Sequence, residues 1–175
     1  MFEHVRRGGR YYRVCDPSWA DPSDTSYSRR KGGRWNVPST KTSSGFGALY
    51  LNATIEVARA NARRHVWSTF AVVLEDLVSE HLPDLQEYDV REQRFVDAVT
   101  RDGISQTGLP FDYATAIPHT PCQQVAQRAY DAGEDGIATL SAVKASGEEL
   151  VIFDPAVSAL VNVGSRRKAT NWLSL

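Results

Sequence analysis

Four side chains along this sequence have the chemistry to hold a phosphorylated, aromatic ligand. Arg13 and Arg34 each carry a guanidinium, which presents a fork of donors to phosphate oxygens and keeps its positive charge. Tyr50 offers an aromatic face on which a flat ring can stack, and the Ser141 hydroxyl can hydrogen-bond a ligand. Each has an ordinary structural alternative: a surface arginine, a core tyrosine, or a serine that caps the next turn.

The segment around Arg34 has an unusual local sequence. Residues 32–36 read Gly-Gly-Arg-Trp-Asn, in which paired glycines permit a tight backbone path before two large side chains. They lie in a polar stretch, residues 16–47, which we predict to be a long surface connection of the kind that is often functional or mobile. Basic residues crowd this end of the chain, so we expect either a local anion site or a solvated basic face. They are Arg6, Arg7, Arg10, Arg13, Arg29, Arg30, Lys31 and Arg34, against Glu3, Asp16, Asp21 and Asp24.

Several functional classes are disfavoured by what the sequence lacks. It has no GxxxxGK[ST], GxGxxG, HExxH or GxSxG motif, so something other than a glycine-rich loop must hold any phosphate. Two distant cysteines and four scattered histidines predict no metal site and no disulfide scaffold. The net charge of −1 argues against direct nucleic-acid binding.

Targeting signals are also absent from the sequence. No run approaches the ~20 apolar residues that a membrane span needs. The first ten residues, MFEHVRRGGR, do not resemble a signal peptide, because charges run throughout them. We therefore expect a soluble, cytoplasmic protein without membrane contact.

The elements that must position these side chains follow from hydrophobic patterning. With 175 residues, 42% of them hydrophobic and 23% charged, the chain suits one folded domain over residues 1–175. Strands mixed with about three or more helices predict a single α/β (α+β) domain with a mixed central sheet. The predicted strands are 10–15, 48–51, 69–74, 136–140, 149–153 and 159–163. The predicted helices are 54–66, 91–101 and 120–132, and 75–90 is predicted to be a connection containing one more short strand.

Taken in order, these segments resemble the RES-domain family, named for its arginine, glutamate and serine. The strand YYRV comes first, GGRWN and ALYL follow, and DGIATLSA and the apolar strand LVIF come much later. The resemblance covers residues 10–154, and GGRWN followed by ALYL is its most specific part. It implies a fold related to that of ADP-ribosyltransferase toxins.

The resemblance also implies an activity. The best-known members are toxins of Xre–RES toxin–antitoxin systems, which break the nicotinamide–ribose bond of NAD with water or phosphate as acceptor, while some transfer ADP-ribose to a protein. A small helix-turn-helix antitoxin covers their cleft, and no metal is needed. Carried over by position, the catalytic residues are Arg34, Asn61 and Ser141, and the residues that hold NAD are Arg13, Arg34, Tyr50 and Ser141. We expect Arg34→Ala to abolish NAD binding.

One position departs from the family pattern. The glutamate expected on the helix after ALYL is replaced by Asn61, which can form hydrogen bonds but carries no negative charge. Glu56 lies about 140° away around the same helix and is a poor substitute, whereas Glu148 or Glu149 can reach the cleft instead. Asn61→Glu is expected to raise NAD turnover. The departure leaves two other interpretations open: a protein that holds NAD or ADP-ribose without fast cleavage, or a protein ADP-ribosyltransferase.

Overall fold

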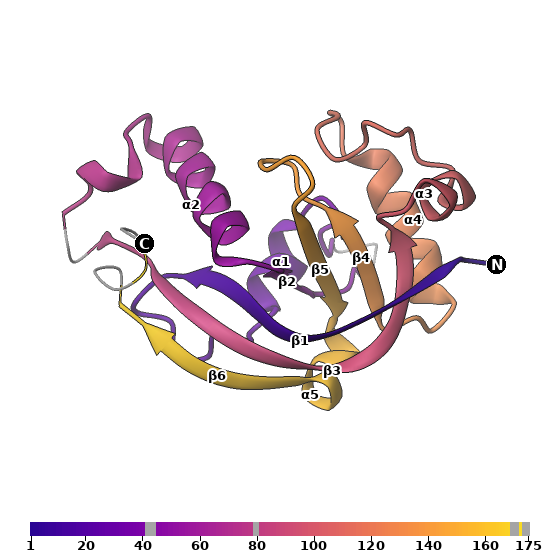
Figure 1. Ribbon diagram of the computed structural model, residues 1–175, viewed down its shortest axis with the longest axis horizontal. Coiled ribbons are helices and arrows are strands. Elements are labelled where there is room, and N and C mark those ends of the chain that lie inside the picture. The colour runs from indigo at the N-terminus through magenta and orange to yellow at the C-terminus, as the bar shows by residue number, and fades with distance from the viewer. Residues whose placement is uncertain (41–44, 79–80, 169–171, 173–175) are drawn as a thin grey trace.

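Two long, curved strands form the base of the molecule. In the computed structural model, which describes residues 1–40, 45–78, 81–168 and 172, β1 (His4–Cys15) pairs antiparallel with β3 (Asp84–Ala98) along nearly its whole length (Figure 1). The other edge of β3 carries β6 (Val161–Arg167) along its first half, antiparallel, and β4 (Gly136–Leu140) at its end, parallel. The predicted mixed α/β architecture is confirmed.

Three short strands complete the sheet, in the order β1-β2-β5-β4-β3-β6. β5 (Glu148–Phe153) lies between β2 (Ala48–Asn52) and β4, antiparallel to both. β2 also meets β1 through the pair Tyr12 and Asn52, so five strands surround a shared core. Because successive residues of a strand face opposite sides, each short strand sends one set of side chains into that core and the other set to the opposite face.

The two faces of the short strands have separate cores. The inner core, shared with β1 and β3, includes Leu49, Leu51, Ala138, Leu150 and Ile152. The opposite face carries Ala48, Tyr50, Ile137, Val151 and Phe153, which pack with residues of α3 (Arg101–Thr107) and α4 (Thr120–Asp131).

The remaining helices flank this framework. The long helix α2 (Ile55–Phe70) stands on the opposite flank from α3 and α4, with the β4–β5 hairpin between them (Figure 1). Short helices α1 (Ser26–Lys31) and α5 (Asp154–Leu160) and the 3-10 turn η1 (Leu74–Asp76) occupy the connections. Within the described ranges, no helix is long and apolar enough to cross a membrane.

The sequence of α2 explains both its start and its orientation. Thr54 caps the helix, its hydroxyl accepting a hydrogen bond from the Val57 backbone N–H at 3.3 Å. Ala58, Ala62 and Val66 recur at helical spacing, and this stripe is buried against side chains that include Leu85 of β3. The opposite side of the helix is thereby left for polar residues.

The predicted helix over 91–101 is wrong, because these residues belong mostly to β3. Its apolar pattern reflects a strand buried on both faces rather than a helical stripe. Phe95 packs into the inner core, while Val96 faces the core beneath α3 and α4.

Two other predicted strands are corrected. Residues 69 and 70 instead belong to the last turn of α2, and Ala71 follows with a left-handed backbone conformation. Leu74 then packs in the same buried cluster as the apolar stripe of α2. The predicted strand 159–163 is confirmed in part: residues 161–163 begin β6, whereas Ala159 and Leu160 end α5, which begins at Asp154–Pro155. Over 69–74, by contrast, tertiary packing overrode β-branched propensity. Of the predicted connections, residues 41–44 and 79–80 lie outside the described residues.

Candidate functional site

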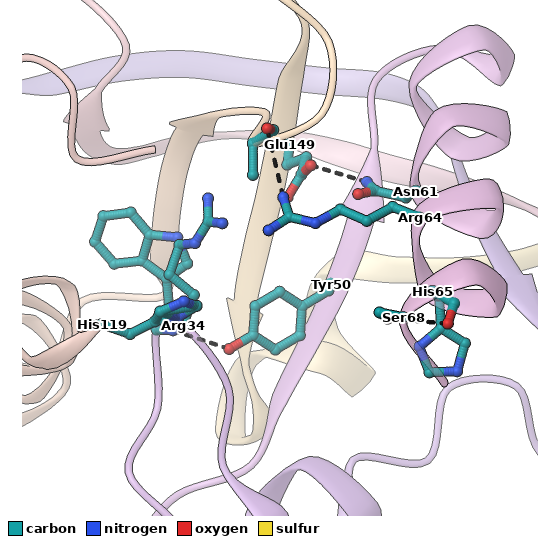
Figure 2. Close-up of a pocket in the computed structure, with 10 residues that line it drawn as sticks. Arg34, Tyr50, Asn61, Arg64, His65, Ser68, His119 and Glu149 are labelled. Carbon is teal, nitrogen blue, oxygen red and sulfur yellow. Dashed lines mark hydrogen bonds between the residues drawn. The ribbon is translucent and has the colours of Figure 1, made fainter. Parts of the chain in front are cut away.

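A pocket of about 430 Å³ opens between α2 and the residue that precedes α4 (Figure 2). This volume lies in the range of small-molecule sites. Its floor comes from β2 and β5, and its walls come from α2, the 33–36 turn and the end of β4. The residues that line it are Arg34, Trp35, Tyr50, Asn61, Arg64, His65, Ser68, His119, Ala142 and Glu149.

α2 contributes a complete polar face to the pocket. Asn61, Arg64, His65 and Ser68 follow the i, i+3, i+4, i+7 spacing that places side chains on one side of a helix. This face adjoins the buried stripe, about 110° around the helix axis at 100° per residue, so packing of the stripe against the sheet aims the polar residues at the pocket.

Arg34 is held at the pocket by a tight turn. Gly32 has φ of +72°, a left-handed conformation that favours glycine, and the Gly33 N–H donates to the Asn36 carbonyl at 2.9 Å. The buried Asn36 side chain donates to the carbonyl oxygens of Ser28 and Phe46 at 2.8 and 3.1 Å.

Tyr50 connects this turn to the sheet. Its hydroxyl accepts from the Trp35 backbone N–H at 3.1 Å and donates to Asn36 Oδ1 at 2.7 Å. Burial raises the pKa of Tyr50, so the phenol stays protonated. Tyr50 therefore lines the pocket while its hydroxyl holds the Trp35 backbone N–H and the Asn36 side chain.

The pocket has a positive electrostatic character. The Arg34 guanidinium makes no hydrogen bond or ion pair within the part of the chain that the structure describes, while Arg64 Nη1 donates to the Ala142 carbonyl at 3.5 Å. Burial, together with the charges of Arg34 and Arg64, lowers the pKa of His119. The cationic form of that imidazole is therefore disfavoured, and an anionic ligand would find Arg34 unengaged.

A chain of amides holds a carboxylate at the other side of the pocket. Asn61 Nδ2 donates to Glu149 Oε1 at 2.9 Å (Figure 2). It also donates to Asn52 Oδ1 at 2.7 Å. Asn52 in turn donates to the Tyr12 carbonyl at 2.9 Å. Asn61 thus lies in the pocket, as its place in the motif predicts, and its side chain is bonded to a glutamate of β5.

The two candidate glutamates of β5 point in opposite directions. Glu149 faces the pocket, whereas Glu148 accepts from Arg7 Nε at 2.8 Å. This is the alternation of a strand, in which neighbouring side chains take opposite faces. Glu56 is exposed in the first turn of α2 and is not among the pocket residues.

Two other predicted site residues lie outside the pocket lining. Arg13 Nη1 donates to the Pro22 carbonyl at 2.6 Å, and its guanidinium lies 5.1 Å from the centre of the Trp19 ring. Ser141 Oγ accepts from the Val143 N–H at 3.3 Å, and the Ser141 N–H donates to the Gly147 carbonyl at 2.7 Å. The serine therefore shapes the turn that presents Ala142 to the pocket. Arg34, Tyr50 and Asn61 are the predicted residues that the fold brings together.

Four pocket residues were not singled out from the sequence: Arg64, His65, Ser68 and His119. The first three carry a signal in their spacing from Asn61, because polar residues at helical intervals beside an apolar stripe mark one continuous face. His119 has no such signal, since it precedes α4 and reaches the pocket only through tertiary packing. Among the described residues, no group of three or more His, Cys, Asp or Glu side chains is placed to hold a metal ion.

Two of the three comparisons with known proteins find matches. A family model of the RES domain matches residues 10–172. A chain in the crystal structure of the M. tuberculosis MbcT–MbcA toxin–antitoxin complex has the same fold, with a TM-score of 0.80 and 19% identity over 98% of this chain and 92% of the other. A search of curated proteins finds no match.

Proposed function

This chain belongs to the RES-domain family, and from that premise we propose that it is a toxin that degrades NAD by cleaving the nicotinamide–ribose bond. The observation that carries the proposal is the meeting of Arg34 and Tyr50 in one pocket, with the Arg34 guanidinium unengaged by the described protein. A dinucleotide needs a cationic fork for its pyrophosphate and a flat surface for its ring. The pocket supplies both.

The proposed reaction transfers the ADP-ribose part of NAD to a simple acceptor. The bond between the anomeric carbon of the ribose and the nicotinamide nitrogen breaks, and both electrons leave with nicotinamide, which becomes neutral. The anomeric carbon then forms a bond to an oxygen of water, with loss of a proton, or of phosphate. Arg34 binds the pyrophosphate and Tyr50 orients the nicotinamide, so the enzyme supplies position and electrostatic stabilisation rather than a covalent intermediate.

We expect a protein partner that neutralises this activity. The similar chain of known structure comes from a toxin–antitoxin complex, and the RES family resemblance points to a small helix-turn-helix antitoxin of the Xre type. Such a partner would act by covering the pocket between α2 and the segment before α4.

A second candidate function is retention of NAD or ADP-ribose without fast cleavage. The observation that favours it is Asn61, which has an uncharged amide where the family pattern has a glutamate. An amide cannot stabilise the positive charge that develops on the ribose.

Nicotinamide release from NAD by the purified protein tests the proposal. We expect release by the unaltered chain, and a requirement for inorganic phosphate would identify phosphate rather than water as the acceptor. Tight NAD binding without nicotinamide release would favour the second candidate. Neither binding nor release would refute both.

A further inference from the structure

We propose that Glu149 of β5 supplies the carboxylate that faces the ribose during nicotinamide release, and that Asn61 of α2 is the residue that positions it. The inference rests on the proposed function, because it names the source of a negative charge that this reaction needs. The charge would come from a strand rather than from the helix that carries it in the family pattern.

The placement of Glu149 supports this role. Among the ten residues that line the pocket, it is the only carboxylate, and it shares the pocket with the cationic Arg34 and Arg64. A positively charged pocket suits the pyrophosphate but opposes cationic character on the ribose, unless an anion lies nearby. Glu149 is the pocket residue that can offset that repulsion.

The contacts of Glu149 leave one oxygen available. Oε1 accepts the hydrogen bond from Asn61, whereas no hydrogen bond of Oε2 is found among the described residues. Both N–H donors of Asn61 are used, one on Glu149 and one on Asn52, which is itself tied to β1. The carboxylate is therefore oriented by a chain of hydrogen bonds from the base of the sheet, with one oxygen left for a ligand.

The same geometry explains why position 61 holds an amide. A carboxylate introduced there would lie within hydrogen-bond distance of Glu149, and two carboxylates sharing one site repel each other. A hydrogen bond between the side chains at positions 61 and 149 needs an amide at one of them, whose N–H donates to an oxygen of the other. Asn61→Glu alone should therefore bring no gain in turnover, which replaces the expectation drawn from the family pattern.

Exchanging the amide at position 61 with the carboxylate at position 149 tests the assignment. Glu149→Gln is expected to lower the rate of nicotinamide release about 100- to 1,000-fold, the usual cost of removing one electrostatic group from an active site. Asn61→Glu combined with Glu149→Gln restores one carboxylate and one amide with their polarity reversed. This double variant should recover at least tenfold of the lost rate. A purely structural role for the pair instead predicts little loss in Glu149→Gln, because an amide oxygen at position 149 can still accept the Asn61 hydrogen bond.

Glu148→Gln is the matched control. It makes the same chemical change one residue away, on the opposite face, where the side chain pairs with Arg7. We expect it to lower thermal stability and to leave the rate of nicotinamide release within about twofold.

The outcomes separate this assignment from the proposed function. Release by the unaltered protein that persists in Glu149→Gln would overturn the assignment alone. So would a Glu149→Gln defect that the double variant fails to recover although it folds and binds NAD, since Asn61 and Glu149 would then not be exchangeable partners. An unaltered protein that releases no nicotinamide would overturn the proposed function and the assignment together.

Discussion

The arginines of this protein divide into two groups with different surroundings. On the strands at the base of the sheet, Arg6, Arg7 and Arg167 each form an ion pair with a glutamate, and Arg29 of α1 pairs with Asp154. In the pocket, Arg34 has no such partner among the described residues. Of the basic residues crowded into the first fifth of the sequence, four are paired with carboxylates: Arg6, Arg7, Arg10 and Arg29. Arg34 is the member of this crowd that lines the pocket.

The number of basic residues in a stretch of sequence is therefore a poor guide to where an anion binds. A guanidinium already bonded to a carboxylate gains little from a phosphate, because it must first lose its partner. An unpaired guanidinium in a pocket keeps its hydrogen-bonding capacity for an incoming anion. The contrast predicts opposite effects when arginines of the two groups are removed.

The largest effect is expected for Arg34→Ala. Loss of a bidentate phosphate contact should weaken NAD binding about 100-fold or more. Thermal stability should change little, because the guanidinium makes no hydrogen bond or ion pair with the described residues. Calorimetric titration with NAD and thermal unfolding measure the two quantities. Arg7→Ala should show the reverse pattern, with lower stability and unchanged affinity. Equal NAD affinity in unaltered protein and Arg34→Ala would remove Arg34 from the site.

A smaller effect is expected for Gly33→Ala, which disturbs the support of Arg34 but not its charge. An added Cβ would lie 2.5 Å from the Tyr50 hydroxyl, so the phenol must move away from Trp35 and Asn36. We expect NAD affinity to fall about tenfold and stability to fall by about 1–2 kcal/mol, as for buried polar groups that lose their partners.

Tyr50→Phe provides the comparison for that variant. It removes the same hydroxyl contacts without adding an atom. NAD affinity and the unfolding temperature should therefore both fall, as expected for Gly33→Ala. If both quantities stay at their original values in Tyr50→Phe, the turn is held without the hydroxyl.

The smallest effect on the ligand is expected for Arg13→Ala. The guanidinium bonds the Pro22 carbonyl and lies against Trp19, so its loss should cost about 1–2 kcal/mol of stability and change NAD affinity less than about twofold. Denaturant unfolding and NAD titration of the same preparation measure both. A large loss of affinity at constant stability would instead support the prediction, made from the family pattern, that Arg13 holds NAD.

Much of the site could be predicted from motif order. GGRWN followed by ALYL identified Arg34 and Tyr50, and counting along the next helix identified Asn61; all three line one pocket. The local reasons lie in the sequence itself: glycines that allow the turn at Arg34, and a threonine cap that sets the register of α2. The role of His119 could not be predicted, because nothing local in a loop residue specifies which distant side chains it will meet.

The fold class, the short strands β2, β4 and β5, the Thr54 cap of α2 and the alternation that sends Glu148 and Glu149 to opposite faces of a strand all follow from the sequence. Which of the two glutamates enters the pocket depends on the tertiary structure. Alternation along a strand places their side chains on opposite faces, but it does not say which face lines the pocket. Direction depends on which face of the sheet α2 and α4 flank and which face β1 and β3 cover. For the same reason the second half of β3 resembles a helix in the sequence: residues 95–98 are buried on both faces and lose the alternating pattern, and their neighbours along the chain do not reveal what will cover them.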